Sequence, residues 1–424
     1  MLNTPITRSL ALCLATSVCG VQTALASGFM LPESSTAGIG LTNALVANPE
    51  ERGAFAYNPA AMGFHDRSSL ALGTYFVGPN FSVDTTSGHH DSDGAEWMIV
   101  PMIQGAFVLD DHWRLGLGVS VPFGLETRWS DGAFPAVSGT RTLGGFSIPL
   151  GHPLASKVEV VDLSPTATYR LSDDLSLSAG IDIYWARQAK LDSTLGALSG
   201  DGYGLGFNLG ALYRQGAWSV GAVFHSSATL ELDGDFTPKS SVLVGLGRLA
   251  RGQSAELDLS LPWRLQLGAR YAFDERLAVE FDISRTGWSA FNDIKVTGKH
   301  GGAVIFVDQN DWDDANAYRL GATYRLDDRT RLSVGYTYDE TGQGDDHFSA
   351  RVPDNDRHLF GLGLARSLGN GLSLEAAYMY VRALDRDYRG AKNYRGGDLN
   401  GSTALTGEYS MDAHLIGLEV VKVF

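Results

Sequence analysis

The sequence predicts an all-β protein, a transmembrane antiparallel β-barrel of about 14 strands. Apolar and polar residues alternate over segments that are longer than ordinary strands. Short and long connections also alternate along the chain, and no run of 18 apolar residues follows residue 26. A barrel can still cross a membrane without such a run, because closure pairs every backbone group.

The first 26 residues predict a secretory signal peptide. Arg8 supplies the positive charge, Leu10 to Val21 form a mostly apolar stretch, and Ala24-Leu25-Ala26 is a cleavage pattern. An N-terminal core helix is the less favoured alternative, because the apolar run is short and ends in small residues. The only two cysteines, Cys13 and Cys19, lie in this segment, so the exported chain has neither disulfides nor thiol chemistry.

Composition narrows the function classes. The formal net charge is −15, which argues against nucleic acid as a partner. The chain has 51 glycines among 424 residues, well above the typical ~7%. High glycine content without a helical pattern favours β-structure, and no motif predicts a cofactor.

Alternation with period two is clearest in "LDLSLPWRLQLGARYAF", from Leu257 to Phe273. Every odd position from Leu257 onward is apolar, whereas the even positions include Asp258, Arg264 and Arg270. A soluble sandwich would bury the apolar face, but a transmembrane barrel turns it towards lipid and its polar face towards the lumen. We expect one continuous outward apolar face here. The same pattern recurs in "LSLSAGIDIYW", "LAVEFDIS", "LSVGYTYD" and "LSLEAAYMY".

Connection lengths predict the strand count and the orientation. Short turns are expected near residues 110–112, 172–174, 215–216, 274–276, 327–329 and 368–370. Long loops are expected near residues 80–95, 125–158, 191–201, 233–256, 291–315, 341–356 and 386–410. Short periplasmic turns that alternate with long external loops are typical of outer-membrane barrels.

Seven fragments in order resemble the FadL family of outer-membrane transporters for hydrophobic compounds. They are "SGFMLPESSTAGIGLTNALVA", "YNPAAM", "VPFGLETRW", "LSPTATYRLSDDLSLSAGIDIYW", "GDGYGLGFNLGALY", "YRLGATYRLDDRTRLSVGYTYDET" and "RVPDNDRHLFGLGLA". The resemblance implies that residues 27–66 form a hatch inside a barrel of residues 67–424. It also implies capture of fatty acids or aromatic hydrocarbons at external loops, a lumenal site and lateral exit through the wall. Ala61 departs from the glycine usual in the family after Asn-Pro-Ala.

The resemblance also implies a cellular context. Phe424 ends the last strand and resembles the signal read by the barrel-assembly machinery, although Lys422 stands where an apolar residue is more usual. We expect a monomer in contact with outer-membrane lipid and lipopolysaccharide. Transport is expected to be passive, because no coupling motif or nucleotide site is visible.

The predicted gate combines the hatch with a proline in the third strand. Pro122 interrupts that strand and suggests a lateral opening, or else it ends the strand at the external rim. By resemblance Phe29 touches ligand, with packing of the hatch as the alternative. The candidate gate residues are Phe29, Asn58, Pro59, Ala60 and Pro122.

Two long loops are unusually apolar, which predicts a landing groove for ligand. Packing of these loops on each other as a lid is the alternative. The candidate groove residues are Phe134, Leu143, Phe146, Ile148, Val242, Leu243 and Leu246. Arg264 and Arg270 are candidates for an inner carboxylate site, unless they pair with Glu280 and Asp282. The acidic loops fit no metal motif, so no metal is predicted.

Two other functions fit the sequence less well. A general porin would leave an open, water-filled lumen, which does not suit an apolar hatch and apolar loops. A hydrolase could use His225 and Ser227, which share one face of a strand, but no acid partner is evident. No G-x-S-x-G or H-E-x-x-H motif is present, so the sequence predicts that the protein is not an enzyme.

Overall fold

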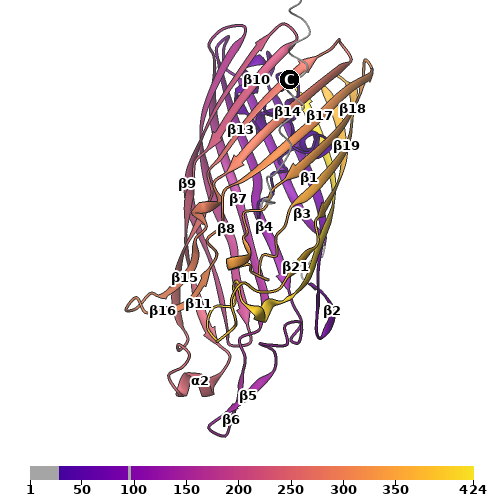
Figure 1. Cartoon of the computed structure of the whole chain (residues 1–424). Coiled ribbons are helices and arrows are strands. Elements are labelled where there is room, and N and C mark those ends of the chain that lie inside the picture. Colours follow the sequence, from indigo (N-terminus) through magenta and orange to yellow (C-terminus); the bar gives the residue numbers. More distant parts are fainter. Residues whose placement is uncertain (1–27, 94–96) are drawn as a thin grey trace, which may run out of the picture.

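The protein forms a tall, closed β-barrel, seen from the side in Figure 1. This computed structural model describes residues 28–93 and 97–424, so the predicted signal peptide lies outside the described residues. Fourteen antiparallel strands form the wall, and β22 (Gly407–Val423) pairs with β1 (Ser69–Thr85) to close it. The predicted barrel is confirmed. Among the described residues, no helix is long and apolar enough to span a membrane.

Continuous strands form most of the wall. Besides β1 and β22, they are β3 (Met98–Val108), β4 (Trp113–Arg128), β7 (Pro153–Arg170), β8 (Leu175–Ser193), β9 (Gly196–Gln215), β18 (Thr330–Asp339) and β19 (Arg357–Gly369). The other strands each consist of two segments. These are β10 (Trp218–His225) with β11 (Ala228–Pro238), β13 (Arg264–Ala272) with β12 (Gln253–Leu261), β14 (Leu277–Thr286) with β15 (Asp293–Gly298), β17 (Ala315–Asp327) with β16 (Val304–Gln309), and β20 (Leu372–Ala383) with β21 (Arg386–Tyr388).

Short elements decorate the two ends and the lumen. They are β2 (Gly88–Asp91), the β5 (Thr140–Leu143) and β6 (Phe146–Pro149) hairpin, α1 (Thr36–Gly40), α2 (Ser241–Gly245), and the 3₁₀ turns η1 (Arg52–Ala56), η2 (Pro59–Phe64), η3 (Trp288–Ala290), η4 (Asp345–His347) and η5 (Thr403–Leu405). The predicted short turns gather at one end of the barrel, and α2, β5 and β6 lie at the other (Figure 1). By the rule for outer-membrane barrels, the first end is periplasmic and the second is external.

One part of the wall has the faces expected of a membrane barrel. We call β10, β13 and β14 the membrane band. Leu267 and Phe281 are 45% and 49% exposed on its outer face, whereas Gln266 and Asp282 are buried on its inner face. The alternation predicted from period two therefore holds here, with apolar residues towards lipid and polar residues towards the lumen.

The same wall reverses its faces nearer the external end. We call β11, β12 and β15 the external sleeve. The two residues between β12 and β13, Pro262 and Trp263, shift the alternation by one position. Leu259 and Leu261 are consequently buried inside the barrel, while Asp258 is exposed outside. The expectation of one continuous outward face from Leu257 to Phe273 is therefore wrong, because a one-residue shift turns every side chain to the opposite face.

A second break has the same effect. Ser226 and Ser227 separate β10 from β11. Leu230 and Leu232 are buried inside, although they share their parity with Val220 on the outer face of β10. The charged outer face of the sleeve is unsuited to hydrocarbon, so the two breaks mark the external limit of the membrane band.

Residues 28–66 cross the lumen of the barrel. On one side α1 packs against β19, β20 and β22, and on the other side η2 packs against β7 and β8. An apolar cluster around Leu45, Tyr57 and Ala61 is completed by Leu212 and Val223 of the wall. Chain segments far apart in sequence thus fill the cross-section of the barrel.

Carboxylates of the wall hold this inner segment by its backbone. The Thr36 N–H donates to Glu419 at 2.7 Å, and the Ala47 N–H donates to Glu280 at 2.6 Å. The N–H groups of Leu45 and Val46 both donate to Asp282, at 3.0 and 3.1 Å. Such charge-assisted bonds are strong but reversible, unlike a covalent tether.

Glycine lets the segment approach the wall closely. A Cβ atom at Gly221 would lie 2.0 Å from the Val46 carbonyl oxygen, and one at Gly335 would lie 2.3 Å from the Leu41 carbonyl carbon. Any other residue would push the inner segment away from β10 or β18. The high glycine content of the strands therefore has a packing role at these positions.

Candidate functional site

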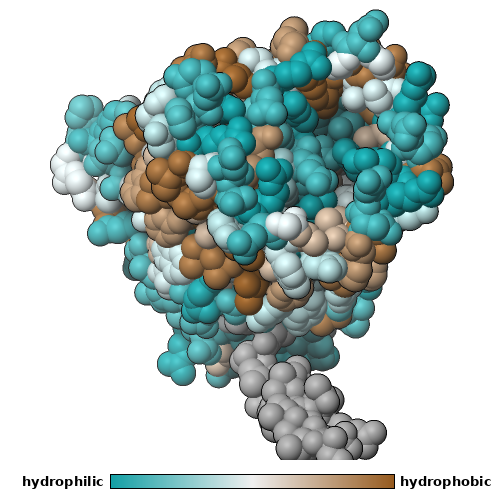
Figure 2. All heavy atoms as spheres, turned by 90° about the horizontal axis from the view of Figure 1, so that it is seen from above, coloured by the Kyte–Doolittle hydropathy of each residue, from teal (hydrophilic) through white to brown (hydrophobic). Residues whose placement is uncertain are grey.

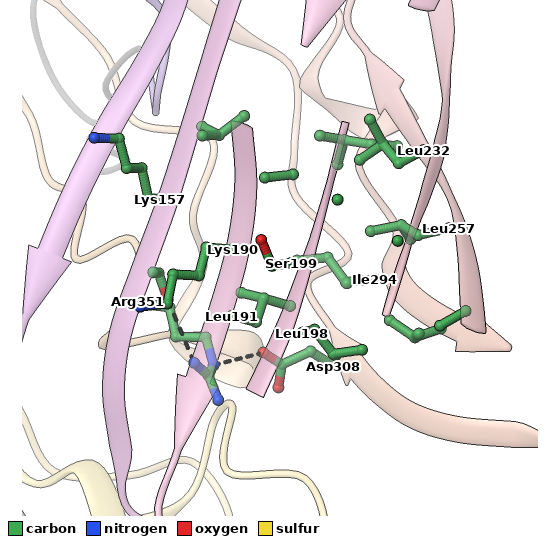
Figure 3. A pocket seen from close by; sticks show the side chains of 18 of the residues that line it. Lys157, Lys190, Leu191, Leu198, Ser199, Leu232, Leu257, Ile294, Asp308 and Arg351 are labelled. Carbon is green, nitrogen blue, oxygen red and sulfur yellow. Dashed lines mark hydrogen bonds and ion pairs between the residues drawn. The ribbon is translucent and has the colours of Figure 1, made fainter. Parts of the chain in front are cut away.

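The external sleeve encloses an apolar cavity of about 110 Å³ (Figure 3). Its walls come from β7, β8, β9, β11, β12 and β15. Leu257 and Leu259 line it only because the break at Pro262 turns them inwards. The side chains drawn around it in Figure 3 include Leu191, Leu198, Leu232, Leu257 and Ile294. The arrangement suits a hydrophobic molecule.

Basic side chains lie at the edge of this cavity. The Arg351 Nε atom lies 3.3 Å from Asp308, the ion pair marked in Figure 3. The Lys157 ammonium lies 2.9 Å from Glu126, and Lys190 lines the same cavity. A carboxylate head group could exchange with these acidic partners while its chain occupies the apolar interior.

Phe29 forms part of the cavity lining and packs in an aromatic cluster. Its ring centroid lies 5.0 Å from that of Trp288, 5.4 Å from that of Phe291 and 5.8 Å from that of Phe123. The Phe29 side chain is only 3% exposed. It therefore packs in the cluster and also lines the cavity, while its contact with ligand stays a prediction.

The residues after Phe29 occupy a gap in the wall. Strands β3 and β4 pair from Val108 and Arg114 only as far as Ile103 and Val119, although β4 continues to Arg128. Beyond that point the inner segment pairs with β4 instead, through an isolated bridge between Met30 and Phe123.

Pro122 lies at this gap. Its carbonyl oxygen accepts a hydrogen bond from the Leu31 N–H at 2.8 Å, and the Gly124 N–H donates to the Phe29 carbonyl at 3.0 Å. Pro122 is inside β4 and not at its end, so the alternative that it merely ends the strand at the rim is wrong. The pairing of β4 with β7 also shifts between Ser120 and Phe123.

A second cavity of about 90 Å³ lies on the other side of this segment. It is lined by Met30, Leu31 and Pro122, and also by Arg264. Met30 and Leu31 line this cavity and Phe29 lines the external one, so the three-residue segment lies between the two.

The Asn-Pro-Ala turn anchors the inner segment to the opposite wall. The Asn58 side chain accepts from the Ala60 N–H at 3.2 Å and donates to the carbonyls of Val46 and Ala211, at 2.8 and 3.0 Å. The Pro59 carbonyl accepts from Thr168 at 2.9 Å. Asn58 and Ala60 are fully buried. One side chain therefore ties two parts of the segment to β9.

An external loop holds the other end of the segment. The Gly28 N–H donates to Asp354 at 3.0 Å, and the Thr341 hydroxyl donates to the same carboxylate. Burial raises the pKa of Asp354, although Arg357 and these hydrogen bonds oppose the rise. Protonation would weaken the hold on Gly28.

The external loops divide into a packed part and an exposed part. Phe134 is fully buried against Trp129, with ring centroids 5.7 Å apart, so it belongs to a lid and not to an open groove. Phe146 and Leu246 are 53% and 49% exposed, while Leu243 is buried and Ile148 and Val242 are half-buried. α2 contacts β6, which brings the two apolar loops together. The side chain of Leu143 lies outside the described residues.

The two candidate arginines have different surroundings. Arg270 is buried and pairs with Glu50 at 2.9 Å, and not with Glu280 or Asp282. It lines a cavity of about 620 Å³ at the periplasmic end, where charged side chains are numerous. Figure 2 looks onto this end and shows a mostly hydrophilic surface. Among the described residues Arg264 forms no ion pair with a carboxylate, and its hydrogen-bond contact is the Met30 sulfur at 3.9 Å.

Sequence reasoning missed an acid partner for His225. The His225 Nδ1 atom lies 3.0 Å from Asp182 Oδ2. Alternation in "LSLSAGIDIYW" predicts that Asp182 faces the lumen, but its proximity to His225 depends on how β8, β9 and β10 pair. Within the described residues the His225 Nε2 atom has no hydrogen-bond partner, and Ser227 is exposed, so no serine triad forms here. The aromatic cluster around Phe29 was also missed, because Trp288, Phe291 and Trp312 come from loops.

A closed barrel with an occupied lumen and two internal cavities is the architecture of a membrane transport protein. Solved structures show the same fold. A Pseudomonas aeruginosa FadL homologue matches with a TM-score of 0.80 and 19% identity, over 93% of this chain and 99% of that one. The Pseudomonas putida toluene transporter TodX matches with a TM-score of 0.67 and 17% identity, over 94% and 99% of the two chains.

The chain belongs to the outer membrane protein transport protein family (OMPP1/FadL/TodX), whose sequence profile matches residues 17–424. A curated relative is the long-chain fatty acid transport protein of Escherichia coli O6:H1 (strain CFT073). It is 25% identical over 425 residues, which cover 88% of this chain and 90% of the relative. The predicted family and the outer-membrane location are thus confirmed.

Proposed function

We propose that the protein passively transports long-chain fatty acids or related lipophilic or aromatic compounds. The observation that carries this proposal is the pair of cavities separated by residues Phe29, Met30 and Leu31. Cargo captured at Phe146 and Leu246 enters the apolar external cavity. Movement of the three-residue segment then opens the way past Pro122, between β3 and β4, into the membrane.

The route explains why the wall is incomplete. An unpaired strand edge facing lipid costs several kcal/mol per polar group. Here Phe29 and Leu31 satisfy the edge of β4, so the gap is closed at rest and can open when they leave. Residues 27–66 thereby act as a hatch in a barrel of residues 67–424. No catalytic step is required.

A reversible cross-link tests this route. Met30 and Phe123 form a bridge, so cysteines at both positions have the Cα separation of about 4.5–5.5 Å that a disulfide accepts. We expect the oxidised Met30→Cys/Phe123→Cys protein to lose fatty-acid uptake and to regain it on reduction. The exported chain has no native cysteine that would interfere.

A matched control uses a closed part of the wall. Ser69 and Ala106 are paired, buried partners of β1 and β3, and their cross-link should leave uptake unchanged. Equal uptake by oxidised and reduced Met30/Phe123 protein would refute the lateral route. Uptake of small sugars by liposomes carrying the wild type would favour a porin instead.

The partners follow from the same architecture. We propose a monomer among outer-membrane lipids and lipopolysaccharide, because β1 and β22 close the wall within one chain. Phe424 is 60% exposed at the end of β22, accessible to an assembly factor. Loss of Phe424 should lower the amount of assembled barrel without changing uptake per assembled molecule.

A further inference from the structure

A polar cluster lies beside the second cavity, the one of about 90 Å³ next to Pro122. The proposed transport route assigns no role to this cluster. Asp182 is fully buried and accepts hydrogen bonds from Asn208 at 2.6 Å and from Ser164 at 2.9 Å. The same Ser164 hydroxyl lies 2.6 Å from Asp162. With the His225 contact to Asp182, these groups form one connected network across β7, β8, β9 and β10.

Two groups of this region have free hydrogen-bonding capacity towards the cavity. The His225 Nε2 atom is buried without a partner among the described residues, and His225 lines the cavity. Arg264 is the cross-strand partner of His225 and lines the cavity as well. Its only hydrogen-bond contact in the described chain is a long one, 3.9 Å to the Met30 sulfur.

The position of this pair matters because the cavity also contains Pro122 and Ser120 of the gap. A fatty acid that enters here carries a carboxylate, and hydrocarbon is a costly environment for a charge. The neutral acid avoids that cost. A proton donor directly before the opening would therefore speed the exit of carboxylated cargo in particular.

We infer that Arg264 and His225 form an inner carboxylate subsite in which His225 protonates the cargo before its lateral exit. This inference rests on the proposed function. Arg264 holds the carboxylate, and the His225 Nε2–H bond breaks as an O–H bond forms on the cargo. The electron pair stays on Nε2, and the neutral imidazole regains a proton from lumenal water.

The neighbours of His225 orient its imidazole ring. The ionisable groups that face it are Asp182 and Tyr184 of β8, Asp162 of β7 and Arg264 of β13. Asp182 accepts from Nδ1, which leaves Nε2 facing the cavity, and Nε2 donates to cargo when the ring carries both of its protons. Histidine is the side chain whose ordinary pKa suits proton exchange near neutral pH.

Uptake of two matched cargoes tests the inference. We compare a long-chain fatty acid with the alcohol of the same chain length, in proteoliposomes between about pH 5 and pH 8. The His225→Gln variant should transport the acid about tenfold more slowly at the upper end of this range. Its transport of the alcohol should stay within about twofold of wild type, and the deficit for the acid should shrink as the pH falls.

Controls separate this role from a structural one. His358→Gln removes a histidine of β19 that contacts Tyr336 on the exposed face, and it should change neither cargo. Should His225→Gln fail to assemble, Arg264→Gln serves instead and should weaken binding of the acid but not of the alcohol. Equal slowing of both cargoes, or of neither, overturns the inference. Failure of wild type to carry either cargo would overturn the proposed function itself.

Discussion

The membrane band and the external sleeve are built from the same strands but have opposite faces. In the band, Leu267 points outwards and Gln266 inwards; in the sleeve, Leu259 points inwards and Asp258 outwards. The change occurs over two residues, at Pro262 and Trp263. A single wall thus has an apolar exterior in the band and, further out, an apolar interior beneath a charged exterior.

The lumen within the membrane band and the lumen within the external sleeve have different contents. The band is filled by the hatch, which polar and charged wall residues such as Asp282 and Glu280 hold by its backbone. The sleeve leaves an apolar cavity with few polar atoms, bounded by Phe29. The inner segment thus fills a polar part of the lumen, whereas the proposed cargo cavity is apolar.

Deleting Pro262 and Trp263 together should have the largest effect, because it removes the whole break between the two regions. The faces of β12 would then keep step with those of β13, which puts Leu257 and Leu259 outside and Asp258 inside. We expect little folded barrel, measured by the heat-dependent mobility shift on gel electrophoresis. Pro262→Ala keeps the chain length and should assemble. A normal barrel that still binds cargo after the deletion would refute the role of the break.

Displacing the hatch from the membrane band should have the second largest effect. In Gly221→Val the new side chain would overlap the Val46 carbonyl, so the hatch must leave its site on β10. The barrel should still assemble but leak small hydrophilic solutes, as liposome swelling would show. Gly118→Ala is the control, since its Cβ would meet only ordinary contacts at 3.8 Å. A tight Gly221→Val barrel would mean that the hatch can shift without opening a path.

Placing a positive charge on the outer face should lower the stability of the barrel less. The loss should be larger in the membrane band than in the external sleeve. Leu267→Arg places a cation against lipid, which costs about 2–4 kcal/mol near the centre of a bilayer. Glu256→Arg lies on the exposed face of the sleeve and should change stability by less than about 0.5 kcal/mol. Urea unfolding in liposomes measures both. Similar losses for the two variants would place the sleeve inside the membrane.

Shortening one leucine on each apolar face should have the smallest effect, a change in ligand affinity alone. Leu259→Ala removes a methine and two methyl groups from the wall of the external cavity and should weaken fatty-acid binding by about tenfold. Leu267→Ala removes the same groups from the lipid-facing side and should leave that affinity unchanged. Ligand titration by quenching of intrinsic tryptophan fluorescence provides the measurement. Equal affinities for Leu259→Ala and wild type would place the cargo elsewhere.

Much of the barrel could be predicted because its signals are local. Period two over Leu175 to Trp185 and turn residues such as Ser172 and Asp173 need no knowledge of the rest of the chain. The gap at Pro122 was also predictable, since a proline cannot donate to a neighbouring strand. The reversal of faces was not, because Leu257 and Leu267 have the same parity and only the pairing of neighbours reveals the shift between them.

The sequence by itself determined the barrel and the family, and it predicted the export signal and the orientation, since each depends on residue types at short spacing. Only the tertiary structure decided what those residues meet. Thr36 and Glu419 are separated by 383 positions and still share a hydrogen bond, and His225 gains Asp182 only through the pairing of three strands. Closure of the barrel brings such residues together, and no local pattern encodes the register at which it closes.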